Sequence, residues 1–110
     1  MNSIWSTEVD VILSRGHSLD GLGIRNWALD KAAAYSALDE LVSMGVGILG
    51  GDVYMQKNGG IHGNYDSWFC VASSGESDAD FAVRSANEAR EYISNYSMKD
   101  ALFSVVPRII

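Results

Sequence analysis

Two runs of β-forming residues, separated by a glycine-rich stretch, lie between helix-forming segments of this chain. The first run, residues 46–55 (VGILGGDVYM), is rich in β-branched residues and is too short and too glycine-rich for a helix. It predicts a strand with a bend or bulge at Gly50–Gly51. Residues 57–64 (KNGGIHGN) are typical of a hairpin loop, and residues 65–72 are the expected return strand, with apolar groups on both faces that predict partial cover on both sides. A β-hairpin is therefore the predicted centre of the fold.

Helical periodicity marks three segments around this hairpin. Asn26 is placed to cap the second helix, and Ser77 begins a Ser-x-x-Asp pattern that caps the third. Pro107 should end a last short strand. The expected elements are a helix over residues 6–16, a loop over 17–25, a helix over 26–44, the hairpin, a helix over 77–96 and a strand over 101–106.

The order of these elements, α-α-β-β-α-β, predicts an α+β fold with helices packed on a small mixed or antiparallel sheet. The chain has 110 residues, a length that fits one domain over residues 1–110. Of these residues 47% are hydrophobic and 20% are charged, a composition that favours a folded core over disorder.

Acidic residues outnumber basic ones by fourteen to eight, giving a formal net charge of −6. This excess argues against general binding of nucleic acid, which requires Lys and Arg to meet phosphates, and against contact with anionic lipid. The charge is concentrated, because residues 61–80 contain four acidic residues and no Lys or Arg. An acidic protein of this kind can instead face a basic protein.

Two interpretations of the acidic segment remain open. Asp78 and Asp80 can simply serve the N-terminus of the third helix, where negative charge is favourable. Alternatively, Asp66, Glu76 and Asp78 form a patch beside Tyr65 that recognises a cationic partner surface, with charge guiding association and aromatic rings supplying contact area.

An enzyme is the competing hypothesis. His62 could approach Asp66, and Asp52 could join them across the hairpin, to hold a metal ion or to act as an acid/base pair in a small hydrolase. The spacing matches no compact ligand pattern, and no nucleophile elbow, phosphate loop or paired cysteine motif is present. We therefore expect no catalytic residues, no metal and no cofactor.

The expected location is the cytoplasm. Cys70 is the only cysteine, so the chain cannot form an internal disulfide, which fits a reducing compartment. The first residues lack the basic and apolar regions of a secretion signal, and no apolar run approaches the roughly 20 residues of a membrane span.

The chain resembles the immunity protein 40 family of bacterial polymorphic-toxin systems. The resemblance lies in residues 48–54 (ILGGDVY), 65–70 (YDSWFC) and 75–77 (GES) and in the helix that ends EYISNY at residue 96, and it extends over about residues 27–106. It implies a small antitoxin without catalysis of its own. Its partner would be the C-terminal toxic domain of a contact-dependent or secreted effector, in many cases a nuclease with a basic cleft.

Charge, aromatic residues and resemblance together mark the candidate toxin-binding residues. Asp52 could contact the toxin or make a structural hydrogen bond, and Trp68 could belong to the core instead. Glycines of the motif are expected to serve backbone geometry. The candidates are Asp52, Tyr54, Tyr65, Asp66, Trp68, Glu76 and Asp78.

Overall fold

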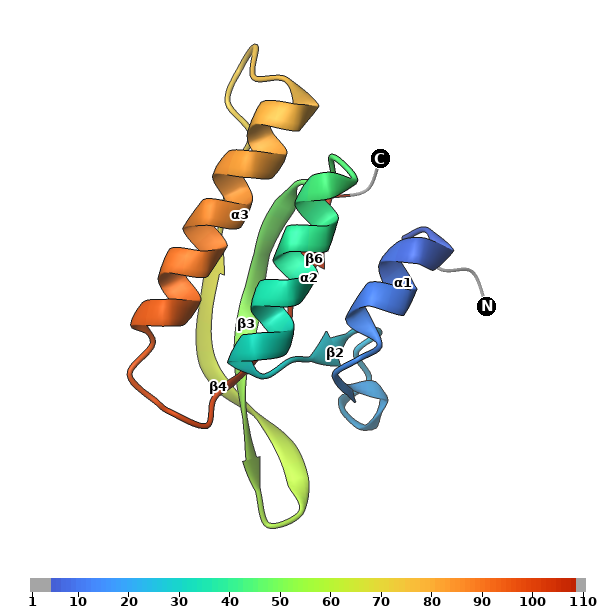
Figure 1. The fold of residues 1–110 in the computed structure, drawn as a ribbon. Coiled ribbons are helices and arrows are strands. Elements are labelled where there is room, and N and C mark those ends of the chain that lie inside the picture. Colours follow the sequence, from blue (N-terminus) through green and yellow to red (C-terminus); the bar gives the residue numbers. More distant parts are fainter. Residues whose placement is uncertain (1–4, 109–110) are drawn as a thin grey trace.

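A computed structural model describes residues 5–108, in which helices cover one face of an antiparallel sheet (Figure 1). The first four residues, part of the segment examined for a secretion signal, lie outside the described range. The predicted α+β class is confirmed. The elements are α1 (Thr7–Leu13), β1 (His17–Ser18), the 3₁₀ turn η1 (Asp20–Leu22), β2 (Trp27–Ala28), α2 (Lys31–Ser43), β3 (Ile48–Lys57), β4 (Gly60–Phe69), α3 (Asp78–Asn95), β5 (Leu102–Phe103) and β6 (Val106–Pro107).

The hairpin of β3 and β4 is confirmed, but the predicted loop over residues 57–64 is wrong. The turn consists of Asn58 and Gly59, both with positive φ (54° and 76°), which is the backbone pattern of a type I′ turn. This turn matches the twist of the two strands, so pairing starts at once with Lys57 opposite Gly60. The return strand consequently begins five residues earlier than expected.

Strand β3 is the centre of the larger sheet, with β4 on one side and both β5 and β6 on the other. An irregularity lies next to the glycine pair and not at it: the register against β6 shifts between Ile48 and Gly50, whereas Gly50 and Gly51 pair with β4 in regular register. A Cβ atom on Gly51 would lie 2.0 Å from the carbonyl oxygen of Ser104 and 2.4 Å from the ring of Trp68. The two neighbours of β3 therefore approach too closely here for any side chain.

Helices α2 and α3 pack side by side on one face of this sheet (Figure 1). Ser77 caps α3 as predicted, through a 3.1 Å hydrogen bond from the Asp80 amide to its hydroxyl. Ser85 Oγ joins α3 to the sheet, because it accepts a 2.8 Å hydrogen bond from the Ile48 amide. Fully buried side chains between the layers include Leu38, Leu41, Ile48, Val53, Phe81, Ile93, Phe103 and Val105.

Asn26 does not cap α2, and this prediction is wrong. The helix begins at Lys31 and is capped by Asp30, whose carboxylate accepts a 2.8 Å hydrogen bond from the Ala33 amide. The Asn26 side chain is buried and donates to the carbonyl oxygen of Val105, at 3.0 Å. It therefore ties the segment before α2 to the C-terminal strands.

The predicted loop over residues 17–25 and the first residues of the predicted second helix have regular structure of another kind. They form the short β1–β2 hairpin and η1. Leu19 and Ala28 of this segment form a second small core with Tyr54 and Leu102. Successive side chains of β3 point to opposite faces of the sheet. Val53 belongs to the main core under the helices, so the adjacent Tyr54, and with it the second core, lies on the opposite face.

The predicted strand over residues 101–106 is divided into β5 and β6. Between them, the Ser104 amide donates to the Asp52 carbonyl (2.9 Å) and the Asp52 amide donates to Ser104 Oγ (3.1 Å). Pro107 does not end the strand but lies within β6, where it pairs with Ile48. Proline is tolerated here because β6 has β3 as its only strand neighbour among the described residues.

Candidate functional site

A hollow of about 350 Å³ opens on the sheet face opposite α2 and α3. Strands β3 and β4 form its floor, and the segment around η1 forms one wall. Leu22 and Ile24 of that wall expose their apolar side chains. We call this site the acidic hollow; it is lined by Leu22, Ile24, Asp52, Val53, Tyr54, Gly63, Tyr65, Asp66 and Ser67.

The rim of the acidic hollow is formed by an irregularity in β4. Asp52 pairs with Ser67 and Tyr54 pairs with Gly63, so the three residues 64–66 face the single residue Val53. Tyr65 lies at the middle of this bulge with φ of +60°. Its side chain is fully exposed, with 102% of the reference area accessible. The bulge therefore lifts one tyrosine out of the sheet.

A hydroxyl group from the end of α3 holds both residues that flank Tyr65. Asn64 Nδ2 donates a 2.6 Å hydrogen bond to the Tyr96 hydroxyl, and that hydroxyl donates to the carboxylate of Asp66. The hydrogen bond to the Asp66 carboxylate raises the pKa of Tyr96, because it stabilises the protonated phenol. The bulge is thereby fastened to the helical layer.

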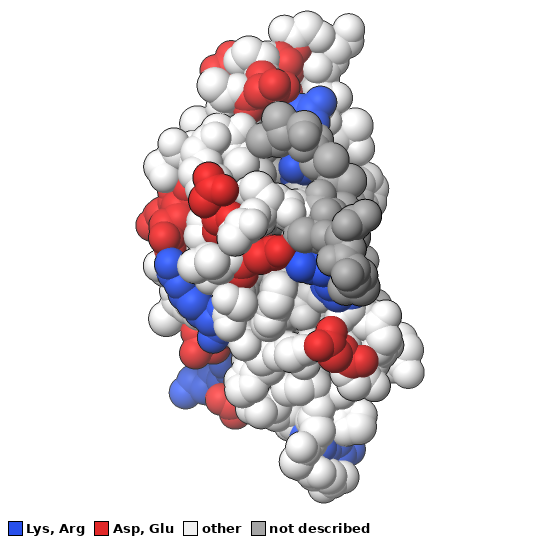
Figure 2. All heavy atoms as spheres, turned by 90° about the vertical axis from the view of Figure 1, so that its right-hand side faces the viewer, with Lys and Arg blue, Asp and Glu red and all other residues white. Residues whose placement is uncertain are grey.

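The acidic hollow is negative. Asp52 and Asp66 both line it and are exposed, and none of the described residues that line it is Lys or Arg. The side of the molecule that lies to the right in Figure 1 carries both signs of charge: blue Lys and Arg side chains lie beside red acidic ones there (Figure 2). The acidic excess is therefore unbalanced at the hollow.

Four of the seven predicted site residues meet at this place: Asp52, Tyr54, Tyr65 and Asp66. Tyr54 is only 5% exposed and forms part of the floor. Burial is the main reason that its pKa is raised. The Asp52 side chain is exposed at the hollow and its backbone amide donates to Ser104 Oγ, so contact with a toxin stays a prediction for this side chain.

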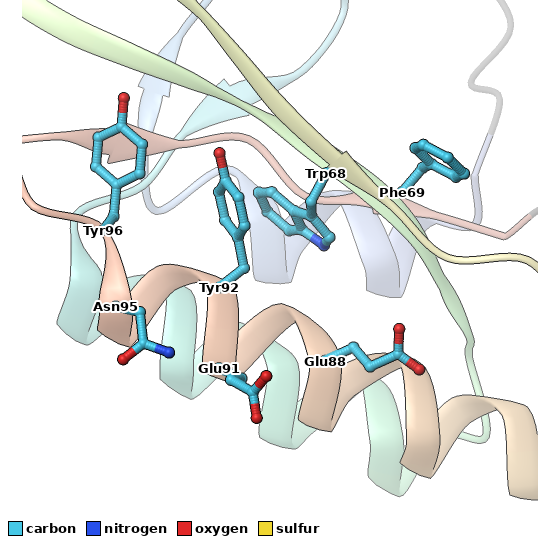
Figure 3. A pocket seen from close by; sticks show the side chains of 7 residues that line it. All are labelled: Trp68, Phe69, Glu88, Glu91, Tyr92, Asn95 and Tyr96. Atoms are coloured by element: carbon cyan, nitrogen blue, oxygen red, sulfur yellow. The ribbon is translucent and has the colours of Figure 1, made fainter.

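Trp68 lies on the other side of β4, in a groove of about 400 Å³ between β4 and α3. Its ring stacks on Tyr92, with centroids 4.9 Å apart, whereas the neighbouring Phe69 points away from the helix and is 79% exposed (Figure 3). The expected cover on both faces of residues 65–72 is therefore wrong, because Tyr65, Phe69 and Val71 on the other face are exposed. Trp68 Nε1 is buried and has no hydrogen-bond partner among the described residues.

Glu76 and Asp78 lie near the start of α3 and do not line the acidic hollow. Two nitrogens of Arg84 donate to the Glu76 carboxylate, each at 2.8 Å, and the Ser73 amide adds a third hydrogen bond. The hydrogen bonds from Arg84 are the main cause that lowers the Glu76 pKa to about 2. Asp78 lies 3.5 Å from Arg108. The structure thus divides the predicted acidic patch: Glu76 and Asp78 form ion pairs, whereas Asp66 lines the hollow and accepts a hydrogen bond from the neutral Tyr96 hydroxyl.

The residues of the enzyme hypothesis are separated. His62 pairs with Met55, three positions along β3 from Asp52, which is roughly 10 Å at the rise of a strand. Its Nε2 atom lies 3.2 Å from the Lys57 carbonyl oxygen. Within residues 5–108 no group of three or more His, Cys, Asp or Glu could hold a metal ion. Burial raises the pKa of Cys70, which disfavours its reactive thiolate form.

Several residues of the site are absent from the predicted set. The sequence places Tyr96 at the end of the third helix, and Leu22 and Ile24 in a loop. Apolar residues between glycines, as in Gly21–Leu22–Gly23, are a signal that could have marked the wall. No local signal predicts the contact of Tyr96 with residues about thirty positions earlier.

No helix within residues 5–108 combines the length and apolar character needed to cross a membrane.

Comparison with known proteins gives one match. No curated protein and no solved structure matches the chain. A family model described as Immunity protein 40 matches residues 18–107, which include the acidic hollow and all seven predicted site residues. Because the match covers most of its 110 residues, the chain belongs to the immunity protein 40 family.

Proposed function

We propose that this protein binds a cognate toxin domain through the acidic hollow and neutralises it as a stoichiometric inhibitor. The observation that carries the proposal is the gathering of Asp52, Tyr65 and Asp66 at one exposed site without a basic residue among the described lining residues. Family membership supports a toxin as the protein that is bound. Inhibition then requires occupancy of the toxin and no catalysis by the immunity protein.

The charge of the hollow favours a toxin with a basic surface. Carboxylates such as Asp52 and Asp66 attract a positive patch over distance and fix its orientation on contact, while apolar groups supply the buried area. A nuclease has such a patch, because its cleft must hold phosphates. We therefore propose the C-terminal nuclease domain of a contact-dependent or secreted polymorphic toxin as the partner, with binding in the cytoplasm of the producing cell.

Neutralisation by titration tests this proposal. The toxin domain encoded by the adjacent gene is purified, and its activity is measured while the immunity protein is added. We expect copurification of the two proteins and loss of activity that is complete at one equivalent. Full toxin activity in the presence of excess immunity protein would contradict the proposal.

Two charge reversals sharpen the same experiment. Asp52→Lys should slow association about tenfold at low salt, because it reverses a charge inside the hollow. Glu8→Lys, on the exposed side of α1, makes the same change in net charge and should leave the association rate nearly unchanged. Equal rates for the two variants would place the interface elsewhere.

A further inference from the structure

Tyr65 occupies a backbone conformation that an aromatic residue rarely adopts. Its φ of +60° lies in the left-handed region, where the Cβ atom of an L-residue approaches the following carbonyl oxygen. Glycine and asparagine reach this region much more easily. Tyrosine at this position therefore lowers the stability of the fold relative to either of them.

The folded chain gains no compensating contact from the side chain. Tyr65 is fully exposed, so its ring buries no area against the rest of the domain. An exposed phenol ring on a rigid support is instead the kind of group that provides buried area in a protein complex. Strain without an internal benefit points to a benefit in the bound state.

The neighbours of Tyr65 are arranged to keep it in place. Asn64 and Asp66 both bind the hydroxyl of Tyr96, one on each side of the strained residue. The ring of Tyr96 packs edge-on against the fully buried Phe103, with centroids 5.7 Å apart. The bulge is thus connected to the main core, and the position of Tyr65 is set before any partner arrives.

We propose that Tyr65 is the anchor residue of the interface and that Tyr96 positions it. The inference rests on the proposed function, because the partner is the toxin domain. The matching surface on the toxin is an apolar recess that accepts a phenol ring, with Lys or Arg at its edge to meet Asp52 and Asp66. Anchoring by a prepositioned ring limits the ordering that binding requires.

Tyr65→Asn is the direct test, because asparagine tolerates the left-handed backbone while it removes the ring. We expect the affinity for the toxin domain of the adjacent gene to fall by about 30-fold or more, while the thermal unfolding midpoint stays equal to that of the wild type or rises. The matched control Val11→Asn removes an exposed apolar group from α1 and should retain wild-type affinity. Unchanged affinity of Tyr65→Asn, or a lower unfolding midpoint, would overturn the inference.

Tyr96→Phe separates positioning from general stability. The variant keeps the ring on Phe103 but loses the hydroxyl that Asn64 and Asp66 share. We expect it to weaken toxin binding about fivefold to tenfold in the wild-type background, because the bulge is then no longer held in place before binding, and to have little effect in the Tyr65→Asn background. An equal loss in both backgrounds would contradict the positioning role. Failure of the wild-type protein to bind the toxin would instead contradict the proposed function itself.

Discussion

Acidic residues of similar sequence context have very different surroundings in this protein. The Glu76 carboxylate receives three hydrogen bonds and its side chain is 13% exposed. Asp52 and Asp66 instead line the open hollow and form no ion pair among the described residues, although Asp66 accepts a hydrogen bond from the neutral Tyr96 hydroxyl. A count of acidic residues therefore does not locate an interface, whereas the partners of each carboxylate do. Charge already satisfied within the chain has less to offer a partner.

The pH dependence of Glu76 follows from its lowered pKa. A carboxyl group with a pKa of about 2 in the folded state and about 4.5 in the unfolded state binds fewer protons when folded at intermediate pH. Its contribution to stability is complete above pH 4.5 and is lost as the pH falls from 4.5 toward 2. We expect Glu76→Gln to lower the free energy of unfolding at pH 7, and the difference from wild type to shrink by pH 2.5.

Urea unfolding at several pH values measures this difference. Glu91→Gln serves as the control, because Glu91 lies exposed on α3, the helix that carries Arg84, and makes no ion pair among those of the described residues. Its effect on stability should be small at every pH. A Glu76→Gln penalty that is the same at pH 7 and pH 2.5 would contradict the assigned role of Arg84.

At the scale of elements, α3 is attached to the sheet through a buried hydroxyl group. Ser85 Oγ accepts from the Ile48 amide and also donates to the Ala82 carbonyl oxygen, at 3.3 Å. Strand β3 is irregular at this point, so no neighbouring strand replaces the serine as acceptor. The side chain satisfies a backbone group that would otherwise be buried without a partner.

Removal of this hydroxyl group should be costly. We expect Ser85→Ala to destabilise the domain by about 1–3 kcal/mol, because the Ile48 amide loses its acceptor in the core. Ser94→Ala changes an exposed serine of the same helix and should alter stability by less than about 0.5 kcal/mol. Chemical denaturation of the three proteins measures both effects, and similar values for the two variants would refute this role of Ser85.

The elements that sequence could predict are those whose signals are local. Ser6 and Ser77 lie at helix starts, and each helix follows its cap as expected. Asn26 has the same capping chemistry, but its side chain bonds to Val105, 79 residues away, which no local pattern reveals. The Asn58–Gly59 pair is a local signal for a tight turn. The glycines that follow it are typical of a loop, so the sequence places the start of β4 too late.

The candidate site also contains residues that the sequence predicts and features that it does not. Asp52, Tyr54, Tyr65 and Asp66 are predicted from charge, aromatic character and the family resemblance, and the hairpin brings them together on neighbouring strands. Register alone, however, could not show the bulge at Tyr65, since it depends on the contact with the distant Tyr96. The ion pair between Glu76 and Arg84 likewise depends on how the segment before α3 folds back onto that helix, which no local pattern predicts.

At the scale of the whole molecule, the helices pack on one side of a thin domain, with principal extents of 45 × 35 × 21 Å. The second small core covers part of the other sheet face and leaves the area around β4 open. The net charge of −6 keeps the protein attracted to basic surfaces, and the hollow provides the place where that attraction is not balanced locally. Helices thus stabilise one face while the other remains available for binding.

Hydrogen–deuterium exchange of the free protein and of its complex with the toxin domain shows whether the acidic hollow is the binding site. We expect added protection around the hollow, in residues 20–24 and 61–69, with little change on α1 and the exposed side of α2. Exchange at these two helices also serves as the internal reference for global stabilisation by binding. Protection centred on α1 and α2, with β4 exchanging as in the free protein, would place the interface on the opposite face and rule out the hollow as the binding site.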